Sequence, residues 1–354
     1  MTTGPIQYPI GETPRSEMPK SQYLMSGVSI VVVCLNEEAV ISKCIDSLLT
    51  QTHKATPFEV IVVDGNSTDK TFSIAKTYSI RYPILSVVVE HKKGTAAARN
   101  RGVTEAQYSL VAFIDADCIA PSQWLSKLVT TYIEETRLDP NVVAVGGRNV
   151  SPPDASSFLQ GIEISLDSYI GSFSSTQGRQ FRSRQRVESI ATLNALYDKS
   201  NLLKIGLFDE SLGSEGEDAD LNFRLRQRGY ELVFLPESVV YHFLRSSPKL
   251  WFKNMFRYGK ARARLLKRHK SMRSPRYLLP PLFISVMATV MLSPMCPVFL
   301  FPLSYFPLIF LYSLIKSYRQ SSWQLSGHVF SAYVMEHFGY GAGMIYGLLS
   351  KQVR

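Results

Sequence analysis

Two aspartates that follow an apolar segment are the first residues in this sequence that could do chemistry. Asp115 and Asp117 come directly after residues 111–114, whose composition is typical of a buried strand. Carboxylates one residue apart repel each other, and a hard divalent cation such as Mg²⁺ relieves that repulsion. Mg²⁺ usually takes one or two protein carboxylates together with substrate phosphates. The pair therefore predicts a site for a metal-bound nucleotide diphosphate.

The same Asp-x-Asp pattern also occurs in phosphatases of the haloacid dehalogenase type, where the first aspartate is a nucleophile. Those enzymes usually carry the pattern on their first strand, whereas three strand–helix units are expected before Asp115. The position of the pair in the chain therefore favours metal–diphosphate binding over a phosphatase site.

A second acidic cluster places four carboxylates within six residues: Glu215, Glu217, Asp218 and Asp220. A helix that starts near Glu217 would turn apolar side chains of the following residues toward the core. Acidic residues in a first helical turn interact favourably with the helix dipole. That reason accounts for Glu217 but not for the whole cluster. One of these carboxylates could accept the proton of an attacking hydroxyl.

The segments around these clusters alternate between strand and helix patterns. Strands are expected at 28–33, 58–63, 84–89, 110–114 and 141–145, helices at 39–49, 67–81 and 95–106, and short strands at 232–234 and 239–241. The strands are continuous apolar runs, which is typical of strands buried on both faces of a mostly parallel sheet. We therefore expect an α/β fold with a central sheet between helices.

Polar residues follow three of the expected strands, at 36–38, 64–69 and 115–117. Each group alone could be a turn or a helix cap. Ligands of open α/β sheets bind beyond the carboxyl ends of the strands. Together the groups predict one binding rim built from three loops.

Six stretches together resemble the family 2 glycosyltransferases of the GT-A fold. They are VSIVVVCLNEE (28–38), FEVIVVDGNSTDKT (58–71), KKGTAAARNRGV (92–103), FIDADC (113–118), GLFDESLGSEGEDADLNFRLRQRGY (206–230) and VVYH (239–242). The resemblance covers about residues 28–242 and implies a Rossmann-like, mostly parallel sheet. The later segments at 256–269 and 336–349 are similar to the membrane-associated branch that contains a succinoglycan glucosyltransferase.

The resemblance implies that six residues bind a nucleotide-sugar donor, usually a UDP-sugar: Asn36, Glu37, Asp64, Arg99, Asp115 and Asp117. The loop with Asn36 and Glu37 would border the nucleoside, Asp64 would bond the base, and Arg99 would line the nucleotide pocket. Asp115 and Asp117 would hold the ribose and the metal-bridged diphosphate, with Mg²⁺ or Mn²⁺ as cofactor. Relatives often have Pro or Thr where this chain has Cys34. The contact between this first loop and the nucleotide base is therefore expected to differ from the family pattern.

The resemblance also implies an inverting transfer of the sugar. Asp218 would be the general base, and Glu217 would help to orient the acceptor or the base. His242 would be a further metal ligand, as in some relatives, although a structural histidine at a strand end explains it equally well.

The net charge of +10 comes from one part of the chain. Residues 245–276 contain twelve Lys and Arg residues interleaved with aromatic residues, and no Asp or Glu. Such a pattern suits nucleic acid or an anionic membrane surface. Because the basic segment runs directly into an apolar one, we expect a lipid-surface helix and no nucleic-acid partner.

Residues 277–315 contain no charged residue. This stretch is long enough for two membrane spans divided near 293–297. Basic residues flank both ends, so the positive-inside rule predicts a hairpin with both ends in the cytoplasm. The prolines also allow a shallow re-entrant hairpin. A third apolar stretch at 325–349 contains Glu336, and the sequence leaves open whether it spans or lies in the interface.

These observations predict four regions. They are a flexible tail without a signal peptide (1–26), a GT-A domain (27–244), a basic amphipathic juxtamembrane segment (245–276) and a hydrophobic membrane region (277–354). The four cysteines form no disulfide-like pattern, which suits a reducing compartment. We therefore expect a cell-membrane protein whose catalytic domain faces the cytoplasm.

A catalytic domain held against a membrane suggests a lipid-linked acceptor, such as a polyprenyl phosphate or a polyprenyl diphosphate-saccharide. Four basic residues could meet its phosphates: Arg182, Arg186, Arg257 and Lys260. A solvated loop explains the first two equally well. The apolar segments could also pack against copies of the chain. Two alternatives stay open, a processive polysaccharide synthase, although no QxxRW-like motif is present, and a catalytically silent scaffold.

Overall fold

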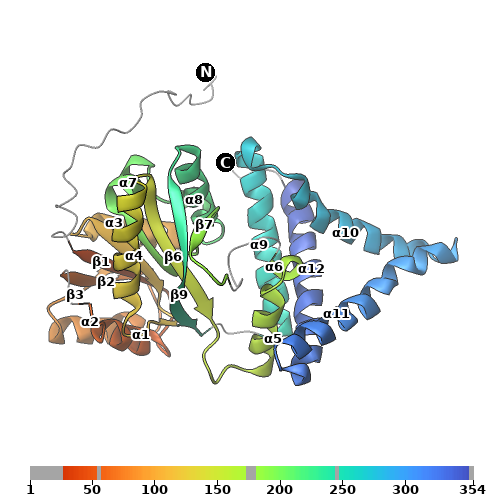
Figure 1. Ribbon diagram of the computed structural model, residues 1–354, viewed down its shortest axis with the longest axis horizontal. Helices are drawn as coiled ribbons and strands as arrows, with labels where there is room; N and C mark the ends of the chain where they lie inside the picture. Colours follow the sequence, from red (N-terminus) through yellow and green to blue (C-terminus); the bar gives the residue numbers. More distant parts are fainter. Residues whose placement is uncertain (1–26, 54–56, 173–180, 244–246, 351–354) are drawn as a thin grey trace, which may run out of the picture.

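The computed structural model describes residues 27–53, 57–172, 181–243 and 247–350. The tail expected at 1–26 lies outside the described residues. Figure 1 shows a sheet flanked by helices, beside a bundle of helices formed by the C-terminal part of the chain.

The first half of the sheet is built from repeating strand–helix units. Its elements are β1 (Val28–Cys34), α1 (Ile41–Leu49), β2 (Phe58–Asp64), α2 (Thr71–Arg81), β3 (Leu85–Val89), α3 (Thr95–Glu105) and β4 (Leu110–Asp115). Strands β3, β2, β1 and β4 lie side by side in that order and run parallel. The sequence prediction of these units is confirmed, with boundaries that differ by a few residues.

The second half of the sheet is mixed. Its elements are β5 (Cys118–Ile119), α4 (Trp124–Leu138), β6 (Val142–Val150), α5 (Ser157–Leu166), α6 (Tyr169–Ser172), β7 (Gln185–Val187), β8 (Asn194–Asp198), α7 (Lys199–Lys204), η2 (Glu210–Leu212), α8 (Glu217–Gln227) and β9 (Glu231–His242). The sheet order continues from β4 through β8, β6 and β9 to β5, and β7 also pairs with β9. Strands β6 and β9 run parallel to each other, whereas β8 is antiparallel to both β4 and β6. Most strands therefore share one direction, as expected for this fold.

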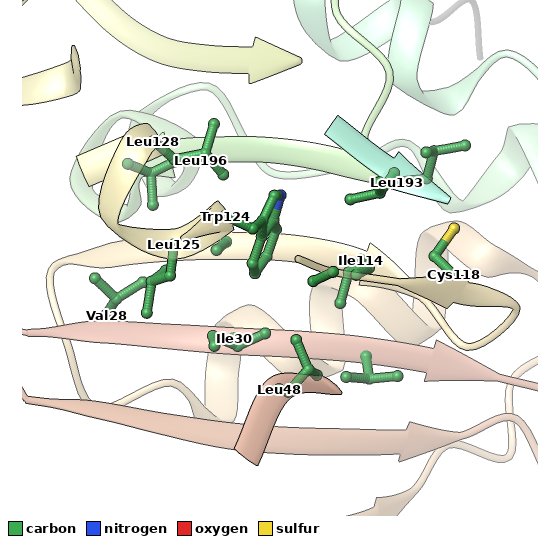
Figure 2. Packing of buried hydrophobic residues seen from close by; sticks show 14 of the residues in the cluster. Val28, Ile30, Leu48, Ile114, Cys118, Trp124, Leu125, Leu128, Leu193 and Leu196 are labelled. Atoms are coloured by element: carbon green, nitrogen blue, oxygen red, sulfur yellow. The ribbon is translucent and has the colours of Figure 1, made fainter. Parts of the chain in front are cut away.

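The sheet is buried on both faces because its strands are apolar at successive positions. In β1, Ile30 and Val32 belong to the core on one face, while Val31 belongs to the core on the other. Figure 2 shows the first of these cores, where Leu48 of α1 and Trp124 of α4 cover the strands. The Trp124 indole donates a hydrogen bond to the Asn194 side chain over 2.8 Å, which satisfies its buried N–H.

One expectation about strands was wrong. The short strands expected at 232–234 and 239–241 are parts of the single strand β9. Its pairing with β6 jumps from Leu235 to Val239, so the residues between them, including Pro236, form an irregularity. Proline cannot donate a ladder hydrogen bond, which is why the sequence pattern breaks there although the strand continues.

The C-terminal part of the chain is helical. It comprises α9 (Pro248–Arg268), η3 (Lys270–Met272), η4 (Pro275–Leu278), α10 (Leu279–Ala288), η5 (Thr289–Leu292), η6 (Pro297–Ser304), α11 (Tyr305–Arg319), η7 (Trp323–Leu325) and α12 (Ser326–Leu349). Helices α9 and α12 lie side by side (Figure 1). A β-carbon on Gly259 would come within 2.1 Å of the Tyr340 carbonyl oxygen, so the two backbones approach closely because glycine has no side chain.

Helices α10 and α11 project from this bundle as a V (Figure 1). The segments Pro275–Leu292 and Pro297–Arg319 are 18 and 23 residues long and apolar enough to cross a membrane. Only 6% and 11% of their most apolar windows are buried within the protein. Large apolar side chains such as Leu282, Phe301 and Leu308 are therefore exposed, which soluble proteins avoid over such an area.

Helix α12, the third apolar stretch, packs against α9, α5, α10 and α11 and is not one of the two candidate spans. Its Glu336 is fully buried and accepts hydrogen bonds from Ser165 of α5 over 2.6 Å and from Trp251 of α9 over 3.3 Å. This helix thus joins the hairpin to the rest of the molecule.

Candidate active site

The register of the parallel strands brings the polar loops to one edge of the sheet. Cys34 pairs with Asp64, and Val33 pairs with Asp115, so β1, β2 and β4 end at the same level. This edge is where ligands bind in sheets of this kind.

The loops after β1 and β2 are held together by hydrogen bonds. The Asn36 backbone N–H donates to the Ser67 hydroxyl over 2.9 Å, and the Asn36 side-chain oxygen accepts from the Thr68 N–H over 2.8 Å. The Glu37 N–H donates to the Thr71 hydroxyl over 2.7 Å. Asn36 has φ of +56°, a left-handed conformation that asparagine tolerates better than most residues. The two loops form one rigid surface that includes Asn36 and Glu37.

Asp64 lies beneath this surface and is only 1% exposed. One of its carboxylate oxygens accepts the Ser67 backbone N–H over 2.7 Å, and the Cys34 thiol lies 3.7 Å from the other. Burial and the nearby Asp64 charge raise the pKa of the Cys34 thiol, which keeps it neutral. Asp64 therefore organises the loop that follows β2.

Asp115 and Asp117 have different partners although they are one residue apart. Asp115 accepts a hydrogen bond from Arg99 over 3.1 Å. An oxygen of Asp117 lies 3.1 Å from Nε2 of His242, because β5 pairs antiparallel with the end of β9 and sets Cys118 opposite His242. Burial raises the pKa of Asp117, but the hydrogen bond with His242, the charge of His242 and smaller hydrogen bonds together outweigh burial and lower it.

Asp117, Cys118 and His242 could hold a metal ion, because their ligand atoms all lie within 4.8 Å of one another. A carboxylate and an imidazole suit Mn²⁺, and carboxylates suit Mg²⁺. Burial raises the pKa of the Cys118 thiol well above its ordinary value, so Cys118 is a poor ligand for a hard cation. The sequence analysis missed Cys118, although its position directly after Asp117 would have identified it as a neighbour.

Arg99 connects the two acidic clusters. It is 3% exposed, and its guanidinium donates to Asp115 over 3.1 Å and to Glu217 over 2.5 Å. Arg99 of α3 thus lies between the end of β4 and the start of α8 and brings Asp115 and Glu217 to one place. One oxygen of Glu217 is buried and has no hydrogen-bond partner among the described residues, which leaves it available to a ligand.

The two acids at the start of α8 have different surroundings. Glu217 is 5% exposed, whereas Asp218 is half-buried. Burial raises the pKa of both carboxyl groups, and the positive charge of Arg99 only partly offsets it. A raised pKa suits a group that must accept a proton near neutral pH. Asp218 is the more accessible of the two.

Helix α9 packs against the loop that carries the acidic cluster. Arg257 pairs with Glu215, and Arg268 pairs with Asp209. His269, just after α9, lies 2.6 Å from Asp220. The basic helix is thus bonded to the catalytic domain through several of its charged side chains.

The structure does not bring the four predicted phosphate-binding residues together. Arg182 is exposed, and Arg186 of β7 is bonded to Glu135 of α4 over 2.6 Å. On α9, Arg257 is paired with Glu215, while the ammonium of Lys260 lies 5.3 Å from the centre of the Tyr346 ring.

A mostly parallel sheet with acidic residues in the loops at its carboxyl edge is the arrangement expected of a GT-A fold. Residues 29–205 match the family described as Glycosyl transferase family 2, and the chain belongs to that family. It is therefore a glycosyltransferase.

Curated relatives agree with this assignment. The chain is 31% identical to the glycosyltransferase AglE of Haloferax volcanii over 66% of this chain and 72% of AglE. It is 22% identical to a dolichyl N-acetyl-α-D-glucosaminyl phosphate glucuronosyltransferase of Methanococcus voltae, over 69% and 75% of the two chains. It is 28% identical to the succinoglycan biosynthesis protein ExoA of Rhizobium meliloti, over 73% and 76%. The expected similarity to the succinoglycan branch is confirmed.

A solved structure has the same fold. The mannosyltransferase PcManGT of Pyrobaculum calidifontis, determined in complex with GDP-Man and Mn²⁺, superposes with a TM-score of 0.57. The match covers 92% of this chain and 90% of PcManGT at 19% identity. The GT-A fold expected from the sequence is confirmed.

Proposed function

We propose that this chain transfers a sugar from a nucleotide-sugar to a hydroxyl of a lipid-linked acceptor, with inversion at the anomeric carbon. The observation that carries the proposal is Arg99, which joins Asp115 of the donor-side pair to Glu217 of the acid pair. An enzyme of this type needs a diphosphate site and a proton acceptor close together. The two ion pairs of Arg99 support a position of the donor-side aspartates next to the acid pair.

On the donor side, the joined loops with Asn36, Glu37 and Asp64 border the nucleoside. The sequence motifs favour UDP, while the similar PcManGT is described with GDP-Man. Binding measurements with UDP- and GDP-sugars distinguish the two nucleotides.

Asp117 and His242, with Asp115 beside them, would hold Mg²⁺ or Mn²⁺. When bound, such an ion supplies positive charge that stabilises the departing diphosphate. PcManGT is described with Mn²⁺, which supports a divalent metal. Nε2 of His242 lies 3.1 Å from an Asp117 oxygen, so a carboxylate and an imidazole are adjacent.

Asp218 accepts the proton of the acceptor hydroxyl. The hydroxyl oxygen then attacks the anomeric carbon, and the bond to the diphosphate breaks on the opposite side with its electron pair. Glu217, held by Arg99 over 2.5 Å, fixes the start of α8 and orients the acceptor. Burial raises the pKa of Asp218, which makes it a better base than a solvated aspartate.

The acceptor is a polyprenyl phosphate or a polyprenyl diphosphate-saccharide, used at the cytoplasmic face of the cell membrane. The exposed apolar helices α10 and α11 support membrane insertion. The Methanococcus relative is named for a dolichyl N-acetyl-α-D-glucosaminyl phosphate, and ExoA is named for succinoglycan biosynthesis. Packing of exposed apolar helices against a second copy would give a homo-oligomer.

The purified full-length protein in detergent tests the donor. We would screen UDP- and GDP-sugars for thermal stabilisation with Mn²⁺ or Mg²⁺, then measure hydrolysis and transfer to polyprenyl phosphate. Metal-dependent stabilisation by one nucleotide class with single-sugar transfer is the expected result. A long polymer product would instead indicate a processive synthase, and no binding of any nucleotide-sugar would contradict the proposal.

A further inference from the structure

Two arginines surround one tyrosine where the chain enters the first candidate span. The guanidinium carbons of Arg262, on α9, and Arg276, on η4, each lie 5.1 Å from the centre of the Tyr277 ring. Arg262 also hydrogen-bonds the Tyr340 side chain of α12. Three separate elements therefore bring two cations and two phenol groups together.

A small pocket that is partly open to solvent lies beside this cluster. It is lined by polar and apolar residues: Tyr169, Arg276, Tyr277, Leu279, Pro280 and Tyr340. Arginine and tyrosine donors suit a phosphate, since a guanidinium presents several N–H groups in a planar fork. Leu279 and Pro280 give the pocket an apolar wall at the start of α10.

The charge of this cluster is poorly neutralised by the protein. No carboxylate lies within 4.0 Å of Arg262 in the described part of the chain, whereas Arg257 and Arg268 on the same helix are paired with Glu215 and Asp209. Arg276 is paired over 3.0 Å with Glu188, whose side chain is 66% exposed, and such surface pairs are weak. The Nε of Arg276 is buried without a partner among the described residues.

The cluster is also within electrostatic reach of the proposed base. Burial raises the pKa of Asp218, and the positive charges of Arg99 and Arg262 act against that rise. The exposed apolar side chains of α10, such as Leu282 and Val286, continue from the pocket along the first candidate span.

We propose that Arg262, Arg276 and Tyr277 bind the phosphate of the isoprenoid-type lipid acceptor, with the lipid chain lying along α10. This inference rests on the proposed function, because it names the acceptor subsite of the same enzyme. It replaces the dispersed residues Arg182 and Arg186 with two arginines that lie beside one tyrosine. The other source of the same chemistry is the headgroup of a bulk anionic phospholipid.

The test uses the full-length protein in detergent with farnesyl phosphate as the probe and farnesol as its uncharged control. Arg262→Gln and Arg276→Gln each remove one of the two cations beside Tyr277. Arg262→Lys keeps the charge but loses the planar fork. Arg319→Gln is the matched control, because Arg319 is exposed at the other end of the same hairpin and its loss changes the net charge equally.

We expect farnesyl phosphate, but not farnesol, to stabilise the wild-type protein thermally. Each Gln variant should bind farnesyl phosphate about tenfold more weakly, the loss expected for a charge-assisted bond to phosphate. Arg262→Lys should recover part of that loss, and Arg319→Gln should bind as the wild type does. Metal-dependent binding of a nucleotide-sugar by each variant confirms that the catalytic domain is still folded.

Unchanged binding in both Gln variants would overturn the inference. An equal loss in Arg319→Gln, or competition by phosphatidylglycerol as effective as that by farnesyl phosphate, would indicate a general anionic surface instead. If the wild-type protein hydrolyses a nucleotide-sugar but does not bind farnesyl phosphate, the subsite fails while the transferase activity stands. If it binds farnesyl phosphate but no nucleotide-sugar, the proposed donor reaction fails.

Discussion

At the scale of single residues, neighbouring carboxylates are separated in function by their partners. Burial acts to raise the pKa of Asp117, but the hydrogen bond and charge of His242, with smaller hydrogen bonds, lower it overall. At Asp218, burial raises the pKa. An ionised carboxylate suits cation binding, and a more basic one suits proton transfer. The local environment therefore favours different roles for two chemically identical side chains.

Replacing Asp218 with Asn should abolish transfer and leave donor binding near normal. Asparagine keeps the shape of the side chain but cannot accept the proton, so we expect kcat to fall by about 10²–10⁴-fold. Titration of the nucleotide-sugar with the same variant provides the comparison. A loss of donor affinity as large as the loss of kcat would show that Asp218 belongs to the donor site instead.

Replacing Asp117 with Ala should weaken metal-dependent donor binding, because it removes the carboxylate that lies 3.1 Å from His242. The measurement is a Mn²⁺ titration of donor binding in the wild type and the variant. Asp154→Ala, which removes an exposed carboxylate elsewhere, should leave the titration unchanged. An Asp117→Ala protein with the wild-type titration would exclude this residue as a ligand.

The pH dependence of kcat/KM should report the acid pair. The working base is the deprotonated form, and burial raises the pKa of both Asp218 and Glu217. Activity should therefore fall as the pH decreases through a value above the ordinary carboxyl range of about 4, with an apparent pKa that belongs to the pair. A rate constant that stays level down to pH 4 in a protein that remains folded would contradict a raised pKa.

At the scale of elements, one buried arginine joins three of them. Arg99 of α3 contacts the end of β4 and the start of α8. The neighbouring helix α9 adds ion pairs on the other side of the acidic loop, through Arg257 and Arg268. The position of the proposed base thus depends on contacts that come from distant parts of the chain.

Arg99→Met should destabilise the protein by about 3–5 kcal/mol, because it leaves Asp115 and Glu217 without their buried countercharge. Arg101→Met is the matched control on the same helix. Its partner Glu105 is one turn away and both side chains are exposed, so its loss should cost about 0.3–0.5 kcal/mol. Thermal unfolding of the two variants measures the difference, and equal values would mean that the Arg99 bridge does not stabilise the fold.

At the scale of the whole molecule, the chain combines a polar catalytic domain with an apolar hairpin. Helices α9 and α12 join the two parts (Figure 1). The exposed apolar surface of α10 and α11 would be unfavourable in water, at about 25 cal/mol for each Å² left uncovered. A bilayer removes that cost, which is the physical reason to expect membrane attachment at this end of the molecule.

Arginine near the centre of each candidate span should release the protein from membranes. We expect the double variant Leu282→Arg and Leu308→Arg to become extractable by carbonate, since each arginine costs about 2.5–3.5 kcal/mol at a helix centre. Leu138→Arg, at an apolar position of the catalytic domain that is 80% exposed, should stay with the membrane fraction as the wild type does. Retention of the double variant would show that the hairpin is not inserted.

The sequence alone determined the repeating strand–helix units, the family and the apolar hairpin. These features depend on local composition: the β-branched run before Cys34, the Asp-x-Asp pair at 115–117 and the uncharged stretch at 277–315 are visible without any structure. The same pattern reasoning divided β9 in two, because Pro236 interrupts its apolar run without ending the strand.

Only the tertiary structure decided which side chains meet. The bridge from Asp115 through Arg99 to Glu217, the pairing of Asp117 with His242, and the position of Arg262 beside Tyr277 and Tyr340 join residues far apart in the chain. The composition of the basic segment at 245–276 predicts a surface for anionic lipids. In the structure, however, its residues Arg257 and Arg268 are paired with acids of the catalytic domain. Charge can be counted from composition, but its partner depends on how helices pack, and packing involves contacts that no local pattern encodes.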